Sequence, residues 1–136
     1  MLEIKDVEKI INEEGFVVSK IKGISMLPFL KQKDDSIVIT KVDRPIKLYD
    51  VVLYKNSSGY VLHRVIDNKG NVLKIKGDNT LSDEEIDTNN ILGILKAKYN
   101  KKGYIELDDE INRKYYELSN KHKLFKRIRN GILRRL

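Results

Sequence analysis

The sequence predicts one mainly β domain of antiparallel strands, with a short helix before it and a basic helix after it. Three observations predict this fold class. Short segments rich in Val, Ile and Tyr recur between residues 16 and 107, turn residues separate them, and helical spacing of apolar residues is confined to the two ends. At 136 residues the chain has the size of a single compact domain.

The first 15 residues predict a short amphipathic helix. Apolar residues recur at spacings of three and four from Ile4 through Val7 to Ile11, and Gly15 provides a stop signal. This helix would be about three turns long.

Residues 16–107 predict the β domain itself. Two connections have the composition of hairpin turns, because residues 56–59 and 67–70 contain the Asn, Ser and Gly residues that tight turns prefer. The predicted strands cover residues 16–21, 36–42, 50–54, 60–66, 71–76, 91–99 and 104–107.

Residues 108–136 return to helical spacing, with Asp108 or Asp109 as the expected N-cap. Residues 121–136 hold seven lysines and arginines and no acid, so the formal net charge of +7 lies in this segment and the remaining chain is balanced. Such a helix is suited to an anionic membrane surface. The alternative is that its apolar side packs on the domain. Nucleic acid is disfavoured as a partner, because no recognition helix or basic aromatic sheet accompanies the charge. The apolar positions of the predicted helix are Ile111, Tyr115, Leu118, Leu124, Phe125, Ile128, Ile132, Leu133 and Leu136.

The composition disfavours several classes of chemistry. Without cysteine there is no disulfide, thiolate metal site or thiol nucleophile, and two histidines are too few for most metal sites. We therefore expect no metal and no cofactor. The N-terminus is acidic and no apolar run approaches the roughly 20 residues that span a bilayer. The expected location is the cytoplasm, or the inner membrane face if residues 121–136 bind lipid.

A serine stands out in the stretch GISMLPFL, residues 23–30. Its neighbours are apolar, Gly23 permits close approach of another segment, and Pro28 stiffens the chain. A stiff apolar loop that presents one hydroxyl is suited to a nucleophile, and Ser25 is the candidate. The alternative is a serine bonded to its own local backbone.

A nucleophilic serine needs a base, and His63 is the candidate. In YVLHRVI, residues 60–66, alternation places His63 on one face of a strand with Val61 and Val65. The alternative is a buried structural histidine. The other histidine, His122, lies among lysines in the tail.

The stretch KGDNTLSDEE, residues 76–85, follows a predicted strand and carries several acids. One of its carboxylates could orient His63, as the third member of a catalytic triad does. The alternative is a solvated acidic loop with an Asx turn.

Taken in order, these segments resemble the serine peptidases of the signal peptidase I and LexA-repressor type, over roughly residues 16–107. Four motifs carry the resemblance. They are Ser25-Met26-x-Pro28 followed by Leu30, Tyr49-Asp50-Val51-Val52 with tyrosine where the family has glycine, His63-Arg64-Val65, and Gly77-Asp78-Asn79. The histidine matches the endoplasmic-reticulum and archaeal signal peptidases, whereas the bacterial enzymes and LexA-type repressors carry lysine there.

The resemblance implies a fold of antiparallel β ribbons and hydrolysis of a peptide bond in a leader peptide or precursor protein. Ser25 would be the nucleophile and His63 the base, so activity should rise with an apparent pKa near 6.5, shifted by burial. Asp83 fits best as the acid that orients His63, with Glu84 or Asp78 as alternatives. Backbone N–H groups near Gly23 to Ser25 would bind the oxyanion. The residues expected at the oxyanion and substrate sites are Gly23, Ile24, Met26, Pro28 and Phe29.

The chain departs from the family in three ways. Gly23 stands where signal peptidases often have serine, only about 20 residues precede it, and the sequence lacks the Ala-Gly or Cys-Gly bond at which repressors cleave themselves. Two alternative functions therefore stay open. One is a non-catalytic module that binds a peptide or partner, and the other is a regulatory peptidase that acts with a separate DNA-binding chain.

Overall fold

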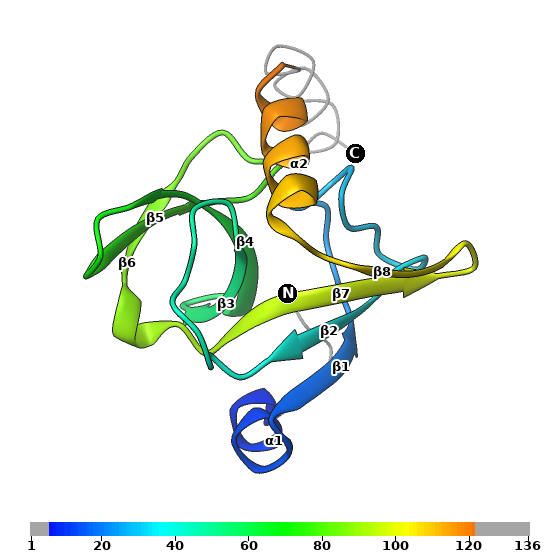
Figure 1. The fold of residues 1–136 in the computed structure, drawn as a ribbon, viewed down its shortest axis with the longest axis horizontal. Helices are drawn as coiled ribbons and strands as arrows, with labels where there is room; N and C mark the ends of the chain where they lie inside the picture. The colour runs from blue at the N-terminus through cyan, green and yellow to red at the C-terminus, as the bar shows by residue number, and fades with distance from the viewer. Residues whose placement is uncertain (1–5, 122–136) are drawn as a thin grey trace.

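The computed structural model describes residues 6–121, which form one antiparallel sheet of eight strands and two α-helices (Figure 1). The fold is mainly β, as the sequence predicts. The elements in chain order are α1 (Val7–Glu14), β1 (Phe16–Lys20), β2 (Ser36–Thr40), β3 (Val51–Asn56), β4 (Gly59–Asn68), β5 (Val72–Lys76), β6 (Glu84–Asp87), the 3-10 turn η1 (Thr88–Asn90), β7 (Gly93–Asn100), β8 (Gly103–Glu106) and α2 (Asp109–Lys121).

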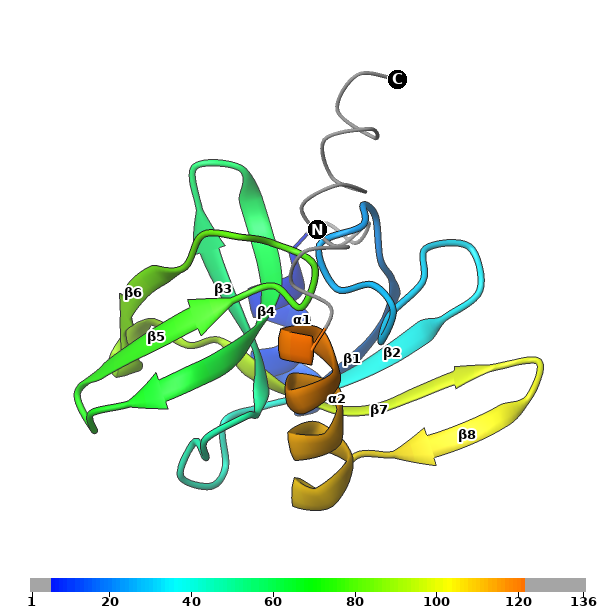
Figure 2. The ribbon, with the colours of Figure 1, turned by 90° about the horizontal axis from the view of Figure 1, so that it is seen from above.

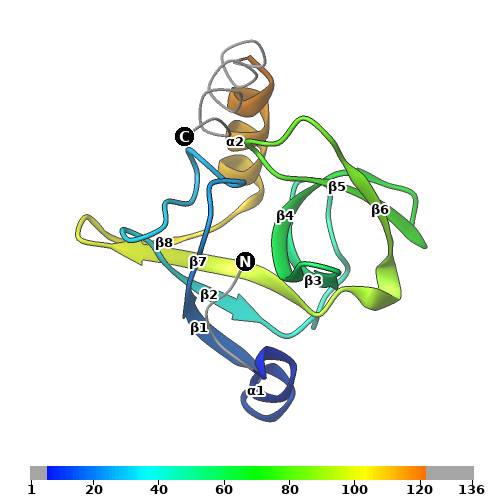
Figure 3. The ribbon, with the colours of Figure 1, turned by 180° about the vertical axis from the view of Figure 1, so that it is seen from behind.

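The strand order is β1-β2-β7-β3-β4-β5-β6, and β8 pairs with the far half of β7. β7 therefore joins two parts of the sheet, because β2 lies on one of its edges while β3 and β8 share the other. In Figures 1 and 3, β3 to β6 curl around one side of the molecule, and β1, β2, β7 and β8 lie on the other.

The curl of the sheet buries both faces of β4. Val61 and Val65 lie in one apolar cluster, on the side toward which β5 and β6 curl. Leu62 lies in a second cluster together with residues of α1, β1 and β2. The face of β4 that carries Val61, His63 and Val65 is thus directed toward one apolar cluster, and the opposite face is directed toward the other.

α1 ends as the sequence predicts. Gly15 adopts a left-handed conformation, with φ of 83°, and its N–H donates to the Ile11 carbonyl. Val7 and Ile11 are fully or almost fully buried against the sheet. The predicted start at Ile4 lies outside the described residues.

The two predicted hairpins are present. Asn56 pairs with Gly59, so only two residues turn between β3 and β4. Between β4 and β5, Gly70 has φ of 93°, and the Asn68 side chain accepts from its N–H. Both turns contain the Asn and Gly residues that predict them.

The sequence does not predict β6, whose residues are Glu-Glu-Ile-Asp. Acidic residues are depleted in strands, so the segment has the composition of a loop. It nevertheless pairs with β5 from Ile75↔Glu84 to Val72↔Asp87. Ile86 packs against the interior cluster, and Glu84 shares its partly buried side of the strand.

α2 lies between the strands β4 and β5 and the β7–β8 hairpin (Figure 2). Its contact face agrees only in part with the predicted apolar stripe. Its buried residues are Asn112 and Ser119, whereas Leu118 is exposed. Tyr115 contacts the Phe29 ring and Tyr116 stacks on Tyr49. Ile111 is partly buried. The predicted positions from Leu124 onward, and the basic segment beyond Lys121, lie outside the described residues.

Neither α1 nor α2 is long and apolar enough to cross a membrane.

Candidate active site

Ser25 lies in the loop between β1 and β2, and the loop is anchored by its own apolar residues. Met26, Phe29 and Leu30 are buried in the core, while Ser25 is partly exposed. Short backbone bonds from Leu27 to Ile24 and from Leu30 to Met26 fold the segment into consecutive turns. The Ser25 hydroxyl is thus at the surface, while the neighbouring apolar side chains anchor its loop in the core.

A second segment holds the loop from the side. The Asn79 backbone N–H donates to the Ser25 carbonyl at 2.8 Å, and its side-chain amide donates to the Ile24 carbonyl at 3.0 Å. Gly77 allows this close approach, because a Cβ there would lie 2.6 Å from the Ser25 carbonyl oxygen and 3.1 Å from His63 Nε2. Any side chain at residue 77 would therefore push apart the two halves of the site.

The structure brings Ser25 and His63 together, as the sequence predicts. His63 Nε2 lies 3.1 Å from Ser25 Oγ, within hydrogen-bond distance. His63 projects from the middle of β4, opposite Val52 of β3, and is partly buried. Burial lowers the pKa of His63 to about 4 from an ordinary value of 6.5, and the nearby Glu84 carboxylate opposes this shift. The imidazole is therefore neutral at pH 7.

The other ring nitrogen of His63 faces Tyr54 of β3. The Tyr54 hydroxyl lies 3.2 Å from His63 Nδ1 and donates to the carboxylate of Glu84 on β6. Asn56 also reaches that carboxylate, with 3.5 Å between its Nδ2 and Glu84 Oε1. Burial, and then the bond to Glu84, raise the pKa of Tyr54, which keeps the phenol protonated.

Of the three candidate acids, the preferred one, Asp83, is not connected to His63. Asp83 is exposed and takes part in none of the hydrogen bonds or ion pairs among residues 6–121. Asp78 is buried and engaged by Arg64, whose Nε and Nη2 donate to its two oxygens at 2.7 and 2.9 Å. Glu84 alone of the three is connected to His63, and the connection runs through Tyr54.

Arg64 follows the base in sequence and points the opposite way. It is fully buried, and besides Asp78 its Nη1 donates to the Tyr49 carbonyl and to Asn112 of α2. Its guanidinium also lies over the Phe29 ring, 5.0 Å from the centroid. The side chain therefore connects the Gly77-Asp78-Asn79 turn, the segment before β3 and the helix α2.

Tyr49 stands where the motif that residues 49–52 resemble has glycine, and its backbone has a glycine-like conformation. Tyr49 has φ of 73°, in the left-handed region where glycine is favoured. Its N–H donates to the Val65 carbonyl, and its ring stacks on Tyr116 at 4.4 Å. These contacts offset the roughly 1–3 kcal/mol that such a conformation costs a residue with a side chain.

The expected oxyanion and substrate residues need two corrections. The Gly23 N–H donates to the Gln32 side chain at 3.0 Å, so it is occupied, whereas the Ser25 N–H has no acceptor among the described residues. Phe29 is 0% exposed and Met26 is 4% exposed, so neither forms the surface of a substrate pocket. Both are apolar neighbours of the serine, and they anchor the loop in the core. Ile24 is partly exposed and Pro28 exposed.

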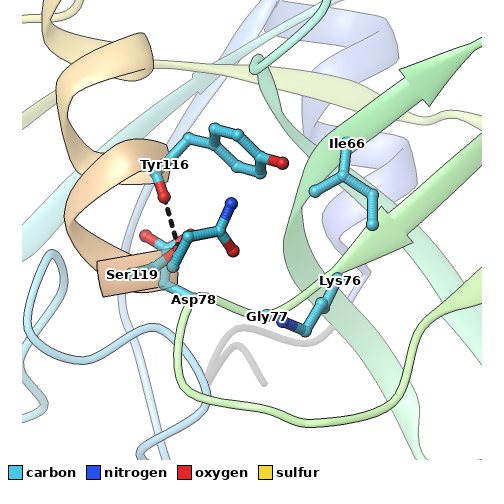
Figure 4. Close-up of a pocket in the computed structure, with 7 residues that line it drawn as sticks. Ile66, Lys76, Gly77, Asp78, Tyr116 and Ser119 are labelled. Atoms are coloured by element: carbon cyan, nitrogen blue, oxygen red, sulfur yellow. Dashed lines mark hydrogen bonds between the residues drawn. The ribbon is translucent and has the colours of Figure 1, made fainter. Parts of the chain in front are cut away.

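A pocket adjoins the Gly77–Asp78 turn, between α2 and the strands β4 and β5 (Figure 4). Ser25 and His63 do not line it. Within the described residues no group of three or more His, Cys, Asp and Glu could hold a metal ion. The residues that line the pocket are Ile66, Lys76, Gly77, Asp78, Tyr116, Ser119 and Asn120.

In comparisons with known proteins, no family model, curated protein or solved structure matches this chain.

Proposed function

We propose that the protein is a serine endopeptidase that cleaves a peptide or precursor protein with a Ser25–His63 pair. The observation that carries the proposal is the 3.1 Å separation between Ser25 Oγ and His63 Nε2. A hydroxyl on a fixed loop, within hydrogen-bond distance of a neutral imidazole, is the arrangement that activates a serine.

The four sequence motifs support the proposal because they contact one another. Asn79 bonds to the Ser25 carbonyl, Arg64 binds Asp78, and the Val65 N–H donates to the Asp50 carbonyl at 2.8 Å. The four motifs that resemble signal peptidases and LexA-type repressors therefore lie together in one site. Their proximity supports a real resemblance, because four short motifs that matched by chance would not be expected to lie together.

The proposed reaction passes through an acyl-enzyme. His63 Nε2 takes the proton of Ser25 Oγ while Oγ forms a bond to the scissile carbonyl carbon, whose oxygen becomes the oxyanion. The Ser25 N–H is one donor available to that oxyanion. The C–N bond then breaks and the proton passes from His63 to the departing amine. Water, deprotonated by His63, then attacks the ester carbon. The bond from that carbon to Ser25 Oγ breaks, the proton passes from His63 to Oγ, and the new carboxyl end is released.

The test is cleavage of a degenerate decapeptide library, read by mass spectrometry. Wild-type protein should produce defined cleavage products, and Ser25→Ala and His63→Ala should reduce their rate of formation by at least about 10³-fold. Ser57→Ala is the matched control, because Ser57 is exposed in the turn between β3 and β4. Products that persist in Ser25→Ala would exclude the nucleophile. Peptide binding without cleavage by wild-type protein would favour a non-catalytic binding module.

We further propose that the protein acts in the cytoplasm, at the inner membrane face if residues 121–136 bind anionic lipid. The support is the sequence of that segment, with seven basic residues and no acid. Co-sedimentation with phosphatidylserine vesicles should fall when residues 122–136 are removed, and equal sedimentation of both forms would exclude this surface.

A further inference from the structure

We infer that Tyr54 and Glu84 are positioning residues that fix the tautomer of His63, with the proton on Nδ1 and the lone pair of Nε2 directed at Ser25. The assignment of the tautomer depends only on hydrogen bonds. Its catalytic consequence depends on the proposed function.

The three side chains lie on one face of the curled sheet. Val52 pairs with His63 and Tyr54 with Val61, so Tyr54 and His63 are diagonal neighbours on β3 and β4. Glu84 reaches the same interior from β6, which pairs with β5 through Ile75. The order of contacts is Ser25, His63, Tyr54 and Glu84.

Counting protons gives the tautomer. A phenol has one proton to donate, and Tyr54 donates it to Glu84, whose carboxylate can only accept when ionised. The Tyr54 oxygen can then only accept from His63, so Nδ1 must carry the ring proton. In a neutral imidazole this leaves Nε2 as the acceptor, facing Ser25 Oγ at 3.1 Å.

The opposite arrangement removes the bond from Tyr54 to the Glu84 carboxylate. If Tyr54 donated to Nδ1, Glu84 Oε1 would retain only the Asn56 amide at 3.5 Å, and Nε2–H would have to donate to Ser25. In that tautomer Nε2, the nitrogen that faces Ser25, has no lone pair with which to accept the serine proton. The Glu84 carboxylate therefore orients His63 through the Tyr54 hydroxyl. In a triad the acid does this by direct contact with the histidine.

The decisive measurement is the ring-nitrogen chemical shift of His63 in long-range ¹H–¹⁵N NMR spectra at pH 7, because protonated and unprotonated imidazole nitrogens resonate far apart. A His122→Gln variant assigns the signals of the two histidines. Wild-type protein should show the Nδ1–H tautomer. Tyr54→Phe removes the acceptor, and Glu84→Ala releases the Tyr54 proton toward Nδ1, so both should shift His63 to Nε2–H.

Two neighbouring acids provide controls for Glu84→Ala. Glu85 points to solvent from the same strand, and Asp83 is exposed just before it, so Glu85→Ala and Asp83→Ala should leave the tautomer unchanged. A wild-type Nε2–H signal, or Nδ1–H retained in both Tyr54→Phe and Glu84→Ala, would overturn the inference. If Tyr54→Phe does not fold, Glu84→Ala decides, since Glu84 is only partly buried.

Kinetics with a peptide that the wild-type protein cleaves supply the second readout. Tyr54→Phe and Glu84→Ala should lower kcat by about 10–100-fold with KM within about twofold, whereas Glu85→Ala should change neither. A loss of kcat in Asp83→Ala, with none in Tyr54→Phe, would restore Asp83 as the acid and overturn the inference. The NMR result does not require cleavage, so failure of the peptidase proposal and failure of this inference are distinguishable.

Discussion

Gly77 is the residue at which the serine loop and the histidine strand meet most closely. Its missing side chain leaves room for the Ser25 carbonyl on one side and for the His63 ring on the other. The position needs glycine for space alone, since its φ is not in the left-handed region.

We predict that Gly77→Ala separates Ser25 from His63 while the domain stays folded. The new methyl group would lie 2.6 Å from a backbone oxygen, which can only move with its loop. Activity should fall by at least about 10²-fold, and the free energy of unfolding by about 1–3 kcal/mol. Peptide cleavage and urea denaturation measure the two effects. Val17→Ala, a core substitution in β1, is the control, because it should lower stability by a similar amount and leave cleavage almost unchanged.

We predict a pH profile that differs from the value near 6.5 expected of an ordinary histidine. Burial lowers the pKa of His63 to about 4, and protonation removes the base, so kcat/KM should fall as the pH drops through about 4 and stay level from about pH 6 to 8. Initial rates in overlapping buffers from pH 3.5 to 8 measure this, with circular dichroism to identify acid unfolding. A midpoint at 6.5 or higher would show that burial does not control the titration.

The sequence predicts that Ser25 and His63 meet, because each is a polar side chain in an apolar segment and the two belong to an ordered set of motifs. Its preferred acid, Asp83, is not connected to His63, whereas the alternative Glu84 is connected through Tyr54. The sequence does not single out this connection, because a tyrosine in a strand is ordinary. Alternation along β3 places Tyr54 beside Val52, and the hairpin turn fixes their register against His63, so a diagonal contact could be derived. The approach of Glu84 depends on the curl of the sheet, which the sequence does not encode locally.

At the scale of elements, the strands that bury β-branched residues are predictable and β6 is not. Each of the seven predicted strands contains Val, Ile or Tyr residues, which give it one or two apolar faces to bury. β6 forms because the edge of β5 offers backbone partners and the interior accepts Ile86. An acidic strand at a sheet edge also discourages pairing with another chain. Its position, rather than its composition, makes it a strand.

The start of α2 resolves the choice between Asp108 and Asp109. The Asp108 carboxylate accepts from the Ile111 N–H at 2.8 Å, the bond of an N-cap, while Asp109 makes only an exposed pair with Lys47 at 3.4 Å. We predict that Asp108→Ala lowers the free energy of unfolding by about 1 kcal/mol and Asp109→Ala by less than about 0.5 kcal/mol. Urea denaturation of both variants measures the difference, and equal losses would contradict this assignment of the cap.

At the scale of the whole molecule, Arg64 is the side chain that connects the site to the rest of the fold. Its guanidinium bonds to Asp78 in the turn that holds Ser25, to the carbonyl of the left-handed residue Tyr49 before β3, and to Asn112 in the first turn of α2. The base and this cation are adjacent in sequence but project from opposite faces of β4. One strand thus carries the proposed chemistry on one face and the connections that hold the surrounding segments on the other.

We predict that Asp78→Ala is among the most damaging single substitutions, because it leaves a fully buried guanidinium without its anion. Breaking a buried pair from one side costs about 3–5 kcal/mol, a large part of the stability of a domain this small. The turn at Gly77–Asn79 would loosen as well, so cleavage should be lost even where the protein still folds. Urea denaturation and peptide cleavage test this against Asp83→Ala. That control makes the same change at an exposed acid and should cost less than about 0.5 kcal/mol. Similar stability of the two variants would mean that Arg64 finds another anion or water, and that the pair with Asp78 does not hold the site together.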